Sequence, residues 1–145
     1  MATGHGKLQC DIITPERPLF SGTCDRVVAP AHDGKRGVLP GHASFITELG
    51  VGLAEVRVED ETGKLQTQRF AVREGFLQVS DNQVTLLAVD ACTRDEAKQE
   101  SDLAKQAEVM RETAGERRSD EEQRKFQRER QWVEARRTLH DEEEF

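Results

Sequence analysis

The sequence has no tyrosine, a single tryptophan and only three cysteines among its 145 residues. So few aromatic rings leave little on which bases or sugars could stack, which argues against a module that binds nucleic acids or carbohydrates. Cys10, Cys24 and Cys92 are dispersed, and no two of them have CxxC spacing. This pattern predicts neither a zinc site nor a disulfide framework, and it is typical of a reducing compartment.

Long apolar runs and an excess of positive charge are absent as well. No stretch approaches the roughly 20 apolar residues that a membrane-spanning helix needs, so we expect any association with a membrane to be indirect, through a partner. The N-terminal segment has no apolar region of the secretory kind. The net charge of −7 argues against nucleic acid as a partner, because binding to phosphates requires clustered Lys and Arg.

The sequence carries no familiar catalytic or metal-binding motif. It contains no GxSxG, no Walker phosphate loop and no HExxH, and its four histidines lack metal-ligand spacing. His32 and Asp33 could form an acid–base pair, but a histidine beside an Asp33-Gly34 turn explains the same residues without chemistry. We therefore expect no catalytic residue, no metal and no cofactor, and we predict that the chain is not an enzyme.

Short segments of alternating polarity fill the first 91 residues. In LQCDI, Leu8, Cys10 and Ile12 fall on one face of an extended chain, and AEVRVE alternates in the same way. RFAV, GFLQV and QVTLLAV follow, separated by REG and SDN. Strands this short, with a turn about every eight to twelve residues, predict an antiparallel sandwich or barrel over residues 1–91.

The composition changes near Cys92. Of the 53 residues that follow it, 28 are charged. Thr93 and Ser119 are each followed three residues later by a glutamate, the capping-box pattern that marks a helix N-terminus. These signals predict a hairpin of two charged helices over residues 92–145.

Both predicted helices are poor in apolar side chains. The first has one narrow stripe, Leu103, Ala107, Met110 and Ala114, which Gly115 interrupts. The second extends to about His140. Little apolar area gives little hydrophobic free energy, at about 25 cal/mol per Å², so we expect the hairpin to dock weakly and to move about a hinge at Gly115. A merely solvated helical tail fits the same pattern.

The stretch GKRGVLPGHASF, residues 34–45, is the most specific in the chain. Its three glycines and one proline predict a stiff, sharply bent loop at the edge of the β domain, and rigid exposed loops are where binding surfaces usually lie. It does not match a phosphate-binding loop, because neither Lys-Ser nor Lys-Thr follows and no helical pattern begins there.

This stretch with its continuation, GKRGVLPGHASFITELGVG, resembles the Gly-x-x-Gly-Val-Leu-Pro-Gly-His-Ala-Pro segment of the epsilon subunit of F-type ATP synthases, called delta in mitochondria. ITPERPLFSG resembles the first strand and turn of that family, and REGFLQVSDNQVTLLAVDA resembles its Gly-Gly-Phe-Leu-Glu-Val…Val-Thr-Val-Leu-Ala ending. The order and spacing of these segments hold over residues 8–91.

The resemblance implies a β-sandwich of about ten short antiparallel strands followed by a C-terminal α-helical hairpin. It implies a non-catalytic rotor subunit of the central stalk that binds the gamma subunit and the c-ring. Because the sequence shows no transit peptide, we expect a bacterial protein, at the cytoplasmic face of the plasma membrane. Such a subunit couples rotation of the ring to the catalytic head. The partner-binding residues that it implies are Lys35, Arg36, Gly37, Leu39, Pro40, Gly41 and His42.

The chain departs from the family pattern at several positions. Ser44 replaces the usual proline, and Lys35 stands where many members carry an acidic residue that faces an arginine of the ring. We therefore expect an atypical contact, in which either Arg36 and Asp33 rearrange or the ring loop differs. The ATP-binding Ile-Asp-x-x-Arg-Ala of many bacterial members is missing from DEAKQESDLAKQAE, so we do not predict ATP binding.

In the family, the second helix can extend into the catalytic head, where basic residues meet an acidic loop of the beta subunit. Arg124 and Arg128 lie four residues apart and share a helix face, so they are the candidates for a contact with the alpha/beta catalytic subunits that would inhibit ATP hydrolysis. A solvated, salt-bridged helix explains them equally well. For the whole chain, the alternative is a free-standing β-sandwich binding module with a helical tail.

Overall fold

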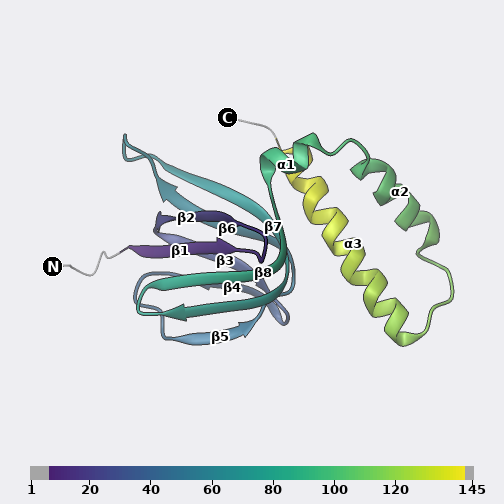
Figure 1. Ribbon diagram of the computed structural model, residues 1–145, viewed down its shortest axis with the longest axis horizontal. Helices are drawn as coiled ribbons and strands as arrows, with labels where there is room; N and C mark the ends of the chain where they lie inside the picture. Colours follow the sequence, from purple (N-terminus) through teal and green to yellow (C-terminus); the bar gives the residue numbers. More distant parts are fainter. Residues whose placement is uncertain (1–6, 143–145) are drawn as a thin grey trace.

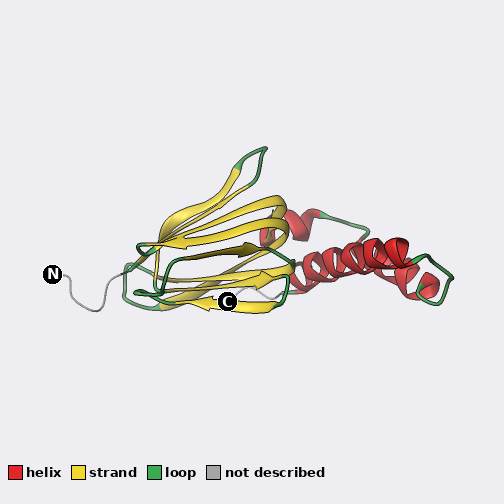
Figure 2. Ribbon diagram, turned by 90° about the horizontal axis from the view of Figure 1, so that it is seen from below, coloured by secondary structure: helices red, strands yellow, loops and turns green. Residues whose placement is uncertain are grey.

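The computed structural model describes residues 7–142, and within them eight strands are followed by three helices (Figures 1 and 2). The strands are β1 Leu8–Ile13, β2 Pro18–Cys24, β3 Arg26–Ala31, β4 Gly34–Val38, β5 Phe45–Glu48, β6 Val51–Glu59, β7 Leu65–Ser80 and β8 Gln83–Thr93. The helices are α1 Arg94–Gln99, α2 Leu103–Thr113 and α3 Asp120–Asp141. The helices lie together at one end of the folded sheet (Figure 1).

The strands follow the order β2-β1-β8-β7-β6-β3-β4, and β5 pairs with β7. This confirms the predicted β-sandwich followed by C-terminal helices. Two details differ from the expectation. β1 and β8 pair in parallel, although only antiparallel strands were expected, and the described residues form eight strands instead of about ten. One reason for the lower number is that RFAV and GFLQV, predicted as separate strands, both belong to β7.

β7 bends at Glu74-Gly75 and so serves both layers of the sandwich. Up to Arg73 it pairs with β6, and from Phe76 onward it pairs with β5. Both residues at the bend have positive φ, 59° for Glu74 and 112° for Gly75. A Cβ atom on Gly75 would lie 1.9 Å from the carbonyl oxygen of Leu87, so only glycine fits. Without a side chain here, the strand can turn from one layer into the other.

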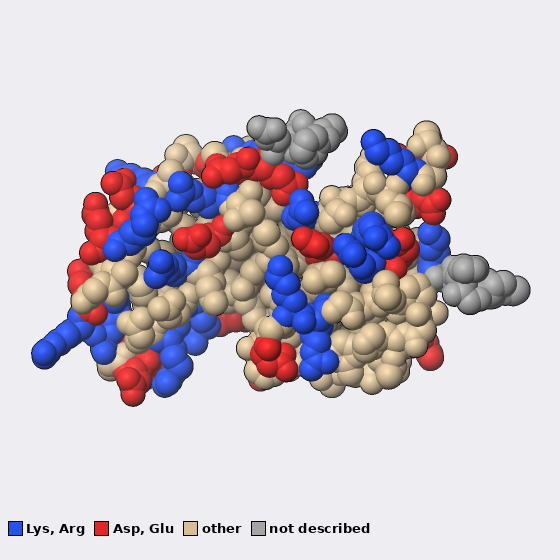
Figure 3. All heavy atoms as spheres, turned by 180° about the vertical axis from the view of Figure 1, so that it is seen from behind, with Lys and Arg blue, Asp and Glu red and all other residues tan. Residues whose placement is uncertain are grey.

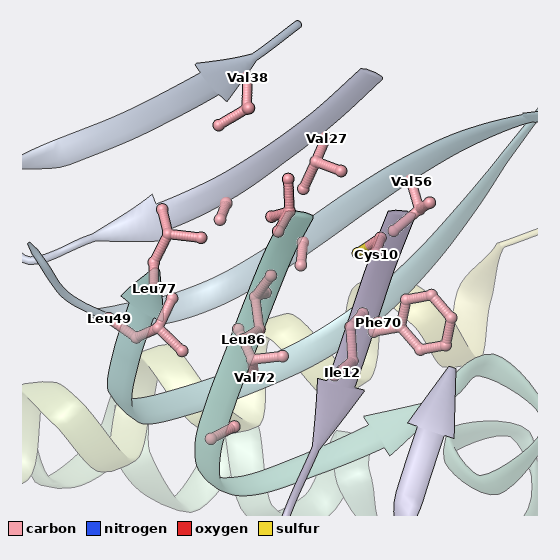
Figure 4. Packing of buried hydrophobic residues seen from close by; sticks show 14 of the residues in the cluster. Cys10, Ile12, Val27, Val38, Leu49, Val56, Phe70, Val72, Leu77 and Leu86 are labelled. Atoms are coloured by element: carbon pink, nitrogen blue, oxygen red, sulfur yellow. The ribbon is translucent and has the colours of Figure 1, made fainter. Parts of the chain in front are cut away.

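The core lies between the layers and is built from the predicted alternation (Figure 4). Leu8, Cys10 and Ile12 are at most 1% exposed, so the face predicted for β1 is confirmed. In β6, Ala54 and Val56 are buried in the same way. The other large side chains that are fully buried in the sandwich are Val27, Val38, Val72, Leu77, Val79, Val84 and Leu86.

Both predicted capping boxes are present, at Thr93 and at Ser119. The single first helix that was predicted is wrong, however, because the chain is extended at Glu100 and helical structure resumes only at Leu103. Between them stand Ser101 and Asp102, and short polar side chains of this kind compete for backbone hydrogen bonds and disfavour a helix interior. None of the described helices is long and apolar enough to cross a membrane.

The last helix, α3, packs on the sandwich more extensively than its few apolar residues suggested. Trp132, Ala135 and Leu139 are buried against Ala71 and Cys92 of the sheet. Their spacing of three and four residues places them on one face of the helix. A sparse apolar stripe is therefore enough to seat the helix, because all of its members face the sheet.

Candidate interaction surfaces

The stretch predicted as one bent loop begins as a strand. Residues 34–38 form β4, which pairs with β3 through Lys35 opposite Pro30 and Gly37 opposite Val28. The loop prediction is wrong for this half because Lys35, Arg36 and Gly37 alternate across an extended backbone. β4 is the last strand in the sheet order, and its first four residues are exposed. Lys35, Arg36 and Gly37 therefore lie on an open sheet edge.

The bend itself is confined to residues 39–42. The backbone N–H of His42 donates to the carbonyl oxygen of Leu39 at 3.1 Å, Pro40 occupies the second position, and Gly41 has φ of 85°. These features define a type II turn, which needs a residue with positive φ in the third position. Leu39 is 54% exposed, so the turn presents a large apolar side chain to solvent. We refer to residues 39–42 as the Pro40 turn.

A residue that sequence reasoning missed supports this turn. The side-chain oxygen Oδ1 of Asn82 accepts a hydrogen bond from the backbone N–H of Gly41 at 2.7 Å. The SDN segment was interpreted only as a separator between strands. A hairpin turn could have been predicted there, but no local signal links Asn82 to a glycine 41 residues earlier in the chain.

The charges around β4 are only partly balanced. Arg36 pairs with Asp33, with 3.5 Å between Nη2 and Oδ2, and its guanidinium lies 5.4 Å from the centre of the Phe45 ring. Among residues 7–142, Lys35 has no ion-pair partner. Whether this pair rearranges a contact with the ring stays a prediction. The ion pair with Arg36 occupies Asp33, and within the described residues no hydrogen bond joins that carboxylate to His32, which argues against the acid–base alternative.

An exposed apolar row crosses three neighbouring strands on the outer face of the sandwich. Leu87 of β8 lies between Ile13 of β1 and Phe76 of β7 in the strand register. All three side chains are exposed, and so is Val89 two residues further along β8. Large apolar side chains scattered singly on a surface need no explanation, but a contiguous exposed group is a candidate binding surface. We call Ile13, Phe76 and Leu87 the apolar row.

The contact between α3 and the sandwich centres on Trp132. The guanidinium groups of Arg73 and Arg136 each lie 5.0 Å from the centre of its ring. Arg73 also pairs with Glu129 of α3 at 3.1 Å, and Arg136 pairs with Glu100 at 2.9 Å. Burial beneath the helix raises the pKa of the Cys92 thiol to about 12. This thiol is therefore a natural reporter of whether α3 is seated.

The two arginines proposed for a catalytic-subunit contact have different surroundings. Nε of Arg128 lies 3.3 Å from the Glu74 carboxylate at the bend of β7. Arg124 is exposed one helical turn earlier. Gly115 lies in the connection between α2 and α3 with open space around it. Of the two arginines, Arg128 thus contacts the sandwich through a surface ion pair.

Ion pairs and hydrogen bonds also hold the end of the described chain, at Glu142, against the rest of the molecule. The Glu142 carboxylate pairs with Arg94 at 3.1 Å and with Arg69 at 3.4 Å. Lys98 donates to the carbonyl oxygen of His140 at 3.2 Å. Arg69, Arg94 and Glu142 also line an open cleft of about 700 Å³ between the start of β7 and α1. Glu143, Glu144 and Phe145 lie outside the described part.

Comparison with known proteins identifies the fold family. The family model for the β-sandwich domain of the ATP synthase delta/epsilon chain matches residues 7–94. The chain belongs to this family. The resemblance predicted from the segment around Pro40 is thereby confirmed, and membership of the delta/epsilon family argues against a free-standing binding module.

Relatives of the delta/epsilon family match most of the chain. The ATP synthase epsilon chain of Pelotomaculum thermopropionicum is 41% identical over 107 residues, which cover 74% of this chain and 72% of the relative. The epsilon chain of Hyphomonas neptunium is 40% identical over 106 residues, with 72% and 76% covered. The chloroplastic epsilon chain of Chlamydomonas reinhardtii is 40% identical over 89 residues, with 61% and 63% covered.

Solved structures share the fold across larger sequence distances. A chain of the mitochondrial ATP synthase of Euglena gracilis, from an assembly with F1 and c-ring, superposes with a TM-score of 0.70 at 20% identity and covers 91% of this chain and 80% of its own. A chain from the central stalk and c-ring of the Tetrahymena thermophila enzyme gives 0.63 at 14% identity, with 95% and 99% covered. Both likenesses include the helices as well as the sandwich.

Proposed function

We propose that the chain is a non-catalytic rotor subunit in the central stalk of an ion-translocating F-type ATP synthase. In this proposal the sandwich joins the gamma subunit to the c-ring and so couples rotation of the ring to the catalytic head. The observation that carries it is a fixed turn, the Pro40 turn, at the end of a delta/epsilon-type sandwich opposite the helices. The chain would sit at the cytoplasmic face of a bacterial plasma membrane and reach the lipid only through its partners.

The Pro40 turn is suited to contact the c-ring. Its backbone is closed by the hydrogen bond between His42 and Leu39, and the His42 ring rests against Phe45 with 5.1 Å between ring centres. A compliant loop would stretch under load, whereas a closed turn passes force to the sandwich. Leu39 supplies apolar contact area, and the open edge at Lys35 supplies a charge for the polar surface of the ring.

The apolar row is suited to contact the gamma subunit. Its three side chains come from adjacent strands and form one surface without an intervening charge in the register. Burying apolar surface contributes about 25 cal/mol per Å², so a partner that covers the row gains affinity from it. The row and the Pro40 turn belong to the same rigid sandwich, which would then bridge the two partners.

The helices are the proposed regulatory part. In the described state, α3 is seated on the sandwich and Arg128 is paired with Glu74. If the connection at Gly115 lets α3 extend towards the catalytic head, Arg128 leaves Glu74 and joins Arg124 on a face that can meet an acidic loop of a catalytic subunit. Such a two-state element requires packings that differ by only a few kcal/mol, and the few apolar residues and partly exposed ion pairs of this interface support the proposal.

Substitution of Leu39 tests the proposal directly. We expect Leu39→Asp to lower ATP-driven ion pumping in membrane vesicles several-fold relative to the rate of ATP hydrolysis, because a carboxylate would be buried against the ring. The matched control is Leu65→Asp, because Leu65 is 47% exposed and Leu39 is 54% exposed, but Leu65 lies at the start of β7. Equal pumping in both variants, or failure of the chain to assemble with gamma and c subunits, would contradict the proposed function.

A further inference from the structure

The amide group of Gly41 occupies a distinctive place in the Pro40 turn. The turn closes through the N–H of His42, so the N–H of Gly41 has no partner within it. Types I and II differ by a flip of the central peptide unit, which here joins Pro40 to Gly41. Whatever binds the Gly41 N–H therefore selects the orientation of that peptide.

Asn82 provides this partner from another hairpin. Its Oδ1 accepts the Gly41 N–H at 2.7 Å, and its backbone carbonyl accepts the N–H of Gln9 at 2.9 Å. Within residues 7–142 this is the only hydrogen bond that ties residues 39–44 to a distant part of the chain. The connections β4–β5 and β7–β8 both lie at the end of the sandwich away from the helices (Figure 1).

The backbone at Asn82 indicates that its side chain has a role of its own. Asp81 and Asn82 form a two-residue hairpin loop with φ of 49° and 61°, between the paired residues Ser80 and Gln83. Such a loop is of type I′, in which glycine is the residue of least strain at the second position. Asparagine tolerates the same conformation and adds an amide oxygen, which in this molecule points at Gly41.

We propose that Asn82 is a positioning residue for the Pro40 turn, which holds the Pro40–Gly41 peptide in its type II orientation and so fixes the direction in which Leu39 and the Pro40 carbonyl face the c-ring. The identity of the partner, the c-ring, rests on the proposed function. The fixing of the turn by Asn82 rests on the hydrogen bond to Gly41. We therefore predict that the oxygen acceptor is what matters, and that the shape of the hairpin loop contributes nothing further.

Two substitutions separate the acceptor from the backbone. Asn82→Gly keeps the positive φ and removes the amide, whereas Asn82→Asp keeps an oxygen at the same place. Hydrogen exchange of the Gly41 amide, measured by NMR on the full chain, should accelerate by about tenfold in Asn82→Gly. A tenfold change corresponds to the net free energy of one intramolecular hydrogen bond. Asn82→Asp should restore slow exchange. Unchanged exchange in Asn82→Gly, or equal acceleration in both variants, would overturn the proposal.

The same variants in the assembled complex test the consequence. We expect Asn82→Gly to lower ion pumping per ATP hydrolysed, and Asn82→Asp to recover it, while the melting temperatures of both chains stay close to that of the unchanged chain. If Leu39→Asp uncouples pumping and Asn82→Gly does not, the positioning role is overturned and the proposed function stands. If Leu39→Asp also has no effect on pumping, the failure lies with the proposed function.

Discussion

In the sandwich, the side chains that pack between the layers are almost all apolar and fully buried. The contact of α3 with the sandwich instead combines a few apolar side chains with ion pairs between arginines and carboxylates. Seen from behind, Lys, Arg, Asp and Glu crowd the helical part, and a broad area of the sandwich carries none of them (Figure 3). Salt screens ion pairs at a surface and so weakens them, whereas apolar burial is not weakened by this screening. We therefore expect salt to weaken the contact of the helices with the sandwich more than it weakens the sandwich itself.

The largest effect is expected from Gly75→Ala, which affects the sandwich. The new methyl group would lie 1.9 Å from the Leu87 carbonyl oxygen, and φ of 112° is strained for any residue with a side chain. We expect the free energy of unfolding to fall by about 3 kcal/mol or more, measured by urea denaturation. The matched control is Gly37→Ala, because a Cβ there meets open space. If Gly75→Ala lowered the free energy of unfolding only slightly, the close contact of Gly75 with the Leu87 carbonyl would be contradicted.

Trp132→Ala should come next and should affect only the helical region. Removing a buried aromatic side chain costs about 3–5 kcal/mol, and Trp132 joins α3 to the sheet through Arg73. We expect α3 to lift while the sandwich stays folded, so that Cys92 becomes exposed and its raised pKa falls. The rate at which a thiol reagent modifies Cys92, followed by mass spectrometry, measures this directly.

Cys10 and Cys24 provide an internal reference for that experiment, because both lie in the sandwich core and should stay unmodified. Phe126→Ala is the control on the same helix, since Phe126 stacks with Arg118 of the α2–α3 connection and lies outside the cluster at Trp132. Modification of all three cysteines in Trp132→Ala would mean that the two regions unfold together, and the comparison would fail.

The two regions also differ in how far the sequence could predict them. Alternation in β1 and β6 and the capping boxes at Thr93 and Ser119 are local signals. The structure confirms the buried strand faces and the helix starts that they predict. The bend of β7 was not predicted, because Glu74-Gly75 resembles an ordinary turn unless the distant Leu87 is known. The hydrogen bond between Asn82 and Gly41 and the packing of Trp132 against the sheet were not predicted for the same reason. Each depends on residues that only the fold brings together.

A smaller effect is expected when the pH falls, and it should reside in the sandwich. Hydrogen bonding from Arg57, with 2.8 Å between Nε and Oδ1, lowers the pKa of Asp25. Because the pKa is lower in the folded state, the stabilisation is present above the unfolded value of about 4 and is lost as the pH falls through the folded value. Asp25→Asn should cost up to about 1 kcal/mol at pH 7. In urea denaturation the difference should shrink as the pH falls below about 4, and a difference that does not shrink would contradict this origin.

The smallest effect is expected from Arg128→Ala, and it bears most directly on the contact of the helices with the sandwich. Arg128 and Glu74 are both about half exposed, so their pair contributes about 0–1 kcal/mol to seating α3. That corresponds to a rise of up to about fivefold in the modification rate of Cys92, and the rise should shrink in high salt. Arg124→Ala removes the same charge one turn away and should leave the rate unchanged. Equal effects of the two variants would mean that helix charge in general, and not the contact with Glu74, holds α3. A larger effect of Arg128→Ala would show that the contact with Glu74 helps to seat α3, and the proposed extension of α3 would then have to break this contact.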